Sequence, residues 1–194
     1  MSDSSQPSNM TDKERPQSTE RSINPVVEGL QTLGLSIVLA LGIRAFVAEA
    51  RYIPSGSMEP TLEINDRLVV EKVSYHFNPP ERGDIVVFRP PESLFKPGQR
   101  RDAFIKRIIG LPGDTVEIAD GTVFVNDEAL TEDYIKEQPL SDWGPETVPD
   151  GFYLVLGDNR NSSFDSRSWG FVAQEDIIGK AVVRFWPPSR VGGL

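Results

Sequence analysis

The chain contains one long apolar stretch, from Gly29 to Ala48, in which Arg44 is the only charged residue. As an α-helix of 20 residues it would be about 30 Å long, which matches the hydrocarbon core of a bilayer. Crossing a bilayer requires Arg44 to lie near one interface, where its long side chain can reach water or lipid phosphate. We therefore predict a membrane anchor over residues 25–50.

Two other interpretations of this stretch remain open. One is a buried core helix, which is disfavoured because the segment has no clear polar face. The other is a cleavable signal peptide that ends in the small-residue pattern Ala48-Glu49-Ala50, although a long, net acidic leader precedes it. Basic residues flank the stretch on both sides, so charge leaves its orientation in the membrane open.

The composition limits what the rest of the chain can do. Residues 1–24 are rich in Ser, Thr, Pro, Gln and charge, and we predict a disordered polar tail there and one folded domain over residues 51–194. A net charge of −9 argues against nucleic-acid binding. The absence of cysteine excludes thiolate chemistry. Because the chain also has a single histidine, His76, a zinc site would need carboxylates almost alone, so we predict no metal site.

Beyond Arg51 the pattern changes to short apolar runs separated by Gly, Pro and Asp, which predicts a mainly β domain. The candidate strands are Arg67–Val73, Asp84–Phe88, Phe104–Ile109, Thr115–Ile118, Thr122–Val125, Phe152–Leu156 and Gly179–Phe185. Asp120-Gly121 predicts a two-residue hairpin turn, because both turn positions favour φ > 0. Pro139–Gly151 is rich in proline, glycine and polar residues, and we expect a long surface loop there.

Two residues suggest nucleophilic catalysis without histidine. Ser57 follows Pro54-Ser55-Gly56, which would hold an irregular, exposed backbone, although a linker between membrane and domain has the same composition. Lys106 lies among large apolar neighbours in a predicted strand. Desolvation lowers a lysine pKa, so a neutral Lys106 could accept the serine proton. Its structural alternative is an edge-strand lysine that prevents aggregation.

Five blocks together resemble bacterial type I signal peptidases, membrane-bound endopeptidases that use a Ser/Lys dyad. The blocks are Pro54–Leu62, Arg67–Val70, Arg82–Phe88, Lys106–Asp114, and Gly157–Arg167 followed by Trp169-Gly170. Their order and residue types are most similar to single-span members of photosynthetic bacteria and plastids. The resemblance implies an antiparallel β-sheet catalytic domain of the signal-peptidase type, preceded by one N-terminal transmembrane helix.

The resemblance also implies catalytic roles. Ser57 is expected to be the acylated nucleophile and Lys106 the general base, and no cofactor is implied. The Ser55 hydroxyl and the Ser57 N–H would form the oxyanion hole. Ser163 matches the family serine that hydrogen-bonds the lysine and fixes its position.

Four charged residues match supporting positions of the family. Asp165 and Arg167 are expected to form one ion pair, and Asp158 and Arg107 a second.

Substrates of the family are exported preproteins, cut after small residues in an Ala-X-Ala-like pattern. The expected substrate-binding residues are Ile53, Pro54, Leu62, Phe104 and Ile105. Arg51 departs from members that have an apolar residue just before the first block, which bears on the finer substrate preference.

The same resemblance predicts the membrane setting. The implied location is the plasma (inner) membrane or the thylakoid membrane, with one span and the catalytic domain on the exported side. The partners would be signal peptides and the lipid bilayer, while the oligomeric state is open. A self-cleaving Ser/Lys repressor-type protease and an inactive, membrane-anchored peptide-binding β-domain are the competing functions.

Overall fold

The computed structural model describes residues 24–96, 98–99 and 102–194, apart from the side chain of Ala45. It divides into two units, residues 1–38 and 39–194, which are considered separately. The predicted disordered tail lies, except for Asn24, outside the described residues.

Helix α1 covers Pro25–Phe46. Among the described residues it is the one helix long and apolar enough to cross a membrane, over Pro25–Arg44, and none of that window is buried. Its leucines and isoleucines are exposed, and the membrane anchor stays a prediction. The helix ends earlier than the apolar stretch, because Ala48 already begins the first strand.

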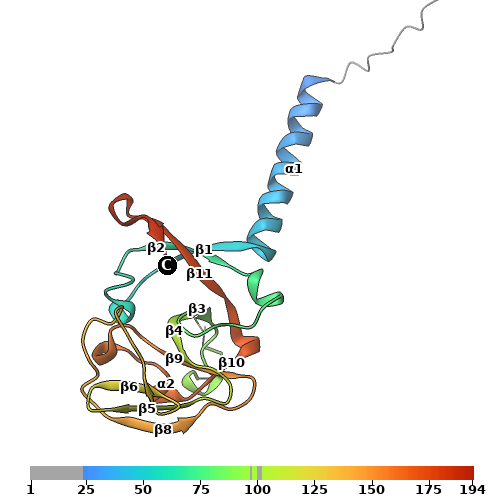
Figure 1. The fold of residues 1–194 in the computed structure, drawn as a ribbon. Coiled ribbons are helices and arrows are strands. Elements are labelled where there is room, and N and C mark those ends of the chain that lie inside the picture. Colours follow the sequence, from blue (N-terminus) through green and yellow to red (C-terminus); the bar gives the residue numbers. More distant parts are fainter. Residues whose placement is uncertain (1–23, 97, 100–101) are drawn as a thin grey trace, which may run out of the picture. The chain divides into compact units, whose positions relative to one another are not determined.

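The domain is built from two antiparallel sheets. The larger has the order β1-β2-β11-β3-β4-β9-β10, with β12 paired to β11, and the smaller has the order β7-β6-β5-β8 (Figure 1). The strands are β1 Ala48–Tyr52, β2 Arg67–Glu71, β3 Ile85–Phe88, β4 Phe104–Gly110, β5 Thr115–Ala119, β6 Thr122–Val125, β7 Glu128–Ala129, β8 Trp143–Thr147, β9 Phe152–Leu156, β10 Val172–Ala173, β11 Ile177–Trp186 and β12 Gly192–Gly193. A short helix, α2, covers Ser166–Trp169. The mainly β prediction is confirmed, and each of the seven candidate strands overlaps an observed one.

The predicted hairpin between β5 and β6 is also confirmed. Asp120 and Gly121 have φ values of 48° and 76°, the left-handed conformation that this tight turn requires. The prediction for Pro139–Gly151 is partly wrong, because Trp143–Thr147 inside it forms β8 and pairs with β5. The side chains of β8 are mostly exposed, so this edge strand lacks the alternating apolar pattern of a half-buried strand. Pairing with β5 holds it in the sheet.

Strand β4 positions the candidate catalytic lysine near the centre of the larger sheet. It lies between β3 and β9, with Lys106 opposite Val86, and Arg107 between Ile85 and Leu156. Successive side chains on a strand point to opposite faces. Lys106 and Arg107 therefore reach two different environments from adjacent positions.

A buried apolar cluster lies behind the loop that carries Ser57. It consists of Ile53, Met58, Leu62, Leu68, Val70, Ile85, Val87 and Ala181, with Ala103, Ile105, Ile178 and Leu194 packed against it. Met58 and Leu62 are completely buried. The loop is thus held by its own apolar residues, with Ile53 before the Gly56–Met58 turn, Met58 within it and Leu62 after it.

Candidate active site

Ser57 lies in a short 3₁₀ turn, Gly56–Met58, directly before the buried Met58. Backbone hydrogen bonds close the turn, from Glu59 N–H to the Gly56 carbonyl and from Leu62 N–H to the Met58 carbonyl. A second segment holds it from outside, because Asn159 N–H donates to the Ser57 carbonyl at 3.1 Å. The short turn and its anchors present the hydroxyl at the edge of a cavity.

The structure brings Lys106 to Ser57. Lys106 Nζ donates hydrogen bonds to Ser57 Oγ at 2.8 Å and to the Ile105 carbonyl at 2.9 Å. The lysine is 5% exposed. Burial lowers the Lys106 pKa from its ordinary value of 10.5 to about 8, against the opposing charges of Asp165 and Asp158. A neutral fraction of the amine is therefore available near physiological pH to take the serine proton.

Ser55 lies next to this pair. Its Oγ is 3.5 Å from Ser57 Oγ, and either hydroxyl can be the donor. Ser55 is exposed with an extended backbone, so its hydroxyl can turn toward a bound carbonyl. The arrangement offers one side-chain donor beside the nucleophile, as an oxyanion hole requires.

A cavity of about 340 Å³ lies over the Ser57–Lys106 pair. Pro54, Phe104 and Ile105, three of the five expected substrate-binding residues, line it. Ile53 and Leu62 do not line the cavity, because both are buried in the apolar cluster beneath the Ser57 loop.

The single histidine is located elsewhere. His76 lines a larger cavity of about 590 Å³ together with Lys72, Tyr75 and Phe152, and Ser57 is not part of that cavity. Lys106 is therefore the basic side chain beside the candidate nucleophile.

Ser163 does not make the expected hydrogen bond to Lys106. Its Oγ is buried and has no hydrogen-bond partner among the described residues, while the lysine donates to Ser57 and to the Ile105 carbonyl. The hydroxyl nevertheless lies close to the pair, packed against Gly157. A Cβ atom on Gly157 would be 2.2 Å from Ser163 Oγ and 2.4 Å from the Ser57 carbonyl oxygen, so only glycine fits at that position.

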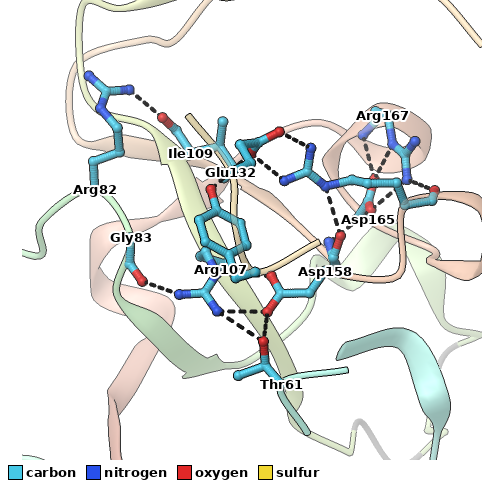
Figure 2. Close-up of polar contacts among 12 residues, drawn as sticks. Thr61, Arg82, Gly83, Arg107, Ile109, Glu132, Asp158, Asp165 and Arg167 are labelled. Atoms are coloured by element: carbon cyan, nitrogen blue, oxygen red, sulfur yellow. Dashed lines mark hydrogen bonds and ion pairs between the residues drawn. The ribbon is translucent and has the colours of Figure 1, made fainter. Parts of the chain in front are cut away.

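Arg107 and Asp158 form the expected ion pair behind the dyad (Figure 2). Arg107 donates to both carboxylate oxygens of Asp158, at 2.9 and 2.6 Å, and to the Gly83 carbonyl at 2.9 Å. Tyr134 places its ring 4.0 Å from the guanidinium carbon. Asp158 is completely buried, and this bidentate contact compensates its charge.

Asp165 and Arg167 form the second expected pair, with contacts of 2.8 and 2.9 Å. Asp165 also accepts the Gly157 N–H at 3.1 Å, which connects this pair to the glycine beside Ser57. Both pairs are drawn in Figure 2.

A third pair was not predicted. Arg160 is 1% exposed and donates to both oxygens of Glu132, at 2.8 and 2.5 Å. Arg167 also donates to the Arg160 carbonyl at 2.6 Å, which joins the two arginines. No sequence signal pointed to Glu132, 28 positions away.

The comparisons with known proteins identify the family of the chain. A protein-family model for signal peptidase, peptidase S26, matches residues 26–186. The chain belongs to this family. The predicted resemblance to type I signal peptidases is thus confirmed.

Relatives in the family extend over most of the chain. A signal peptidase I from Leptolyngbya laminosa is 57% identical over 100% of this chain and 96% of its own length. A probable signal peptidase I-2 from Synechocystis sp. is 60% identical over 84% of this chain and 75% of its own. A probable thylakoidal processing peptidase 2 from Arabidopsis thaliana chloroplasts is 44% identical over 89% of this chain and 47% of its own.

Proposed function

We propose that this chain is a membrane-tethered serine endopeptidase that removes N-terminal signal peptides from exported preproteins. The observation that carries the proposal is the 2.8 Å contact between Ser57 Oγ and the buried Nζ of Lys106. An alcohol becomes a strong nucleophile when a positioned base removes its proton, and a desolvated amine can be that base.

The reaction is acyl transfer. Neutral Lys106 takes the proton as Ser57 Oγ attacks the scissile carbonyl, and the new alkoxide oxygen is stabilised by the Ser55 hydroxyl and the Ser57 N–H. The ammonium then gives its proton to the leaving amine. Neutral again, Lys106 activates the water that hydrolyses the acyl-enzyme.

The cavity supports a preference for small side chains at the cleavage site. Pro54, Phe104 and Ile105 give it apolar walls, and the space of about 340 Å³ is shared by an extended peptide and its side chains, which favours short apolar ones. Residues 104–106 of β4 pair with β3 and not with β9, so their second edge can pair with such a peptide. We expect cleavage after Ala-X-Ala-like sequences.

Helix α1 supports a membrane tether close to the catalytic domain. Its last residue, Phe46, is 11 positions before Ser57, so a span over Pro25–Arg44 would keep the nucleophile near membrane-held signal peptides and raise its effective concentration. The named relatives include a thylakoidal processing peptidase. We expect a single span in a plasma or thylakoid membrane, with the catalytic domain on the exported side.

The decisive experiment uses the full chain, purified in detergent, and a preprotein whose signal ends in Ala-X-Ala. We expect the wild type to cleave once, after that motif, and Ser57→Ala and Lys106→Ala to be inactive while remaining folded by circular dichroism. Ser168→Ala, which removes an exposed hydroxyl from α2, is the matched control and should retain full activity.

Cleavage by Ser57→Ala at the wild-type rate would refute the dyad. A folded wild type without activity would instead favour the inactive peptide-binding domain. Alkaline carbonate extraction of membranes tests the anchor separately, because an integral protein stays in the pellet and a peripheral one is released.

A further inference from the structure

Thr61 is bonded at both its side chain and its carbonyl, although it takes no part in the proposed chemistry. It lies four residues after Ser57, on the same loop. Its hydroxyl donates to Asp158 Oδ2 at 2.6 Å and accepts from Arg107 Nη2 at 3.3 Å (Figure 2). Its carbonyl oxygen accepts from Arg184 Nη1 at 2.6 Å and from Arg190 Nη2 at 3.4 Å.

The side-chain bonds connect the loop of Ser57 to the strand of Lys106. Arg107 is the next residue after Lys106 on β4, so a hydroxyl held by the Arg107–Asp158 pair is held close to the lysine backbone. Asn159, directly after Asp158, binds the other end of the loop through the Ser57 and Gly56 carbonyls. Together these contacts fix both ends of the 56–61 segment to one polar network.

The carbonyl bonds come from the end of the chain. Arg184 lies on β11 and Arg190 lies in the 3₁₀ turn Pro188–Arg190, beyond the last residue of the family match. Arg190 also pairs with Glu63 and, at 3.2 Å, with the buried Asp66. The two arginines therefore bind the whole stretch from Thr61 to Asp66.

Residues 187–194, here called the clasp, are themselves anchored. Gly192 pairs with Arg184 in β12, and Leu194 N–H donates to the Val182 carbonyl at 3.1 Å. Leu194 packs against the apolar cluster that contains Met58 and Leu62. The clasp thus contacts the Ser57 loop through ion pairs on one side and apolar packing on the other.

We propose that Thr61, held by Arg184 and Arg190, is a positioning residue that sets the separation of Ser57 and Lys106. The inference rests on the proposed function. The two reacting groups are carried by separate elements, a short turn and a strand, and their contact depends on how those elements are joined. A displacement of about 1 Å is enough to lower a rate by about 100-fold.

The first test compares Thr61→Val, which keeps the shape and the carbonyl but removes the hydroxyl, with Thr61→Ser, which keeps it. We expect Thr61→Val to lower kcat about tenfold with KM within about twofold, and Thr61→Ser to restore kcat. The matched control is Thr147→Val, which breaks a hydroxyl pair with Thr115 in the smaller sheet and should leave kcat unchanged.

The second test changes Arg190 in the clasp, first alone and then together with Thr61. Arg190→Ala should lower kcat severalfold, Arg190→Lys should recover part of it, and the double variant with Thr61→Val should lose less than the product of the single losses, because both act on one contact. The two Arg190 single variants still test the inference if Thr61→Val does not fold.

Unchanged kcat in both Thr61→Val and Arg190→Ala would overturn the inference. So would a lower melting temperature without any fall in kcat, which is the result of a purely structural role. Failure of the proposed function is distinguishable, because the wild type would then not cleave or Ser57→Ala would be as active.

Discussion

Lys106 and Arg107 are adjacent buried cations on one strand, yet their surroundings give them opposite chemistry. Arg107 meets the Asp158 carboxylate in a bidentate contact and stays charged. Lys106 meets a hydroxyl and a carbonyl, and no described carboxylate lies within ion-pair distance of its Nζ. An amine without a counterion loses its proton more easily when buried. The fold therefore places a neutral base and a permanent positive charge at adjacent positions of one strand.

The strongest way to break this comparison is to make the charge at position 106 permanent. A guanidinium stays protonated, so we expect Lys106→Arg to lower kcat/KM for preprotein cleavage by at least about 1,000-fold. Arg107→Lys retains a cation opposite Asp158 and should stay within about tenfold of wild type. Rates measured on equal amounts of folded protein decide this, and substantial activity of Lys106→Arg would refute a neutral base.

The second prediction concerns stability. Asp158→Ala leaves the Arg107 guanidinium buried without its partner, which should lower the free energy of unfolding by about 3–5 kcal/mol. Glu59→Ala removes an exposed pair with Lys136 and should leave the free energy of unfolding nearly unchanged. Urea denaturation of the detergent-solubilised variants measures both. Equal losses would show that burial does not distinguish the two pairs.

The third prediction is the most specific test of Lys106 and concerns the pH dependence of kcat/KM. Because burial lowers the Lys106 pKa to about 8, kcat/KM should rise with pH, falling about tenfold for each unit below the pKa and levelling off above it. His76→Ala should have the same profile, since His76 lines a different cavity. A flat profile between pH 6 and pH 9 would contradict the proposed base.

The same pKa has a consequence for stability. Between about pH 8 and the ordinary value of 10.5, the unfolded lysine binds more protons than the folded one, so stability should rise with pH in that range. Lys106→Met removes this rise. It should also be more stable than wild type at pH 7, by on the order of 2–3 kcal/mol, although inactive.

Much of the fold could be predicted because its signals are local. Short apolar runs separated by Gly, Pro and Asp identified seven of the strands, and Asp120-Gly121 identified the hairpin. Strand β8 was missed because its residues are mostly exposed. The residue types around Ser57, Lys106 and the two expected ion pairs came from the family resemblance, and the structure then brought each pair together.

Other contacts had no sequence signal. Ser163 was expected to bind Lys106, but its Oγ has no hydrogen-bond partner among the described residues, and the amine bonds Ser57 and a backbone carbonyl. Glu132 and Thr61 resemble ordinary polar loop residues in the sequence. Their partners were identifiable only after the loops had been brought together.

The sequence by itself determined the apolar helix, the strand-rich domain and the residue types available for serine chemistry, because helix length, side-chain alternation and turn preferences act over a few neighbouring residues. The tertiary structure decided which groups meet. Ser57 and Lys106 are 49 positions apart, and Thr61 and Arg184 are 123 apart. Desolvation of the lysine and the joining of its strand to the nucleophile loop depend on how distant segments pack, and no local pattern encodes that.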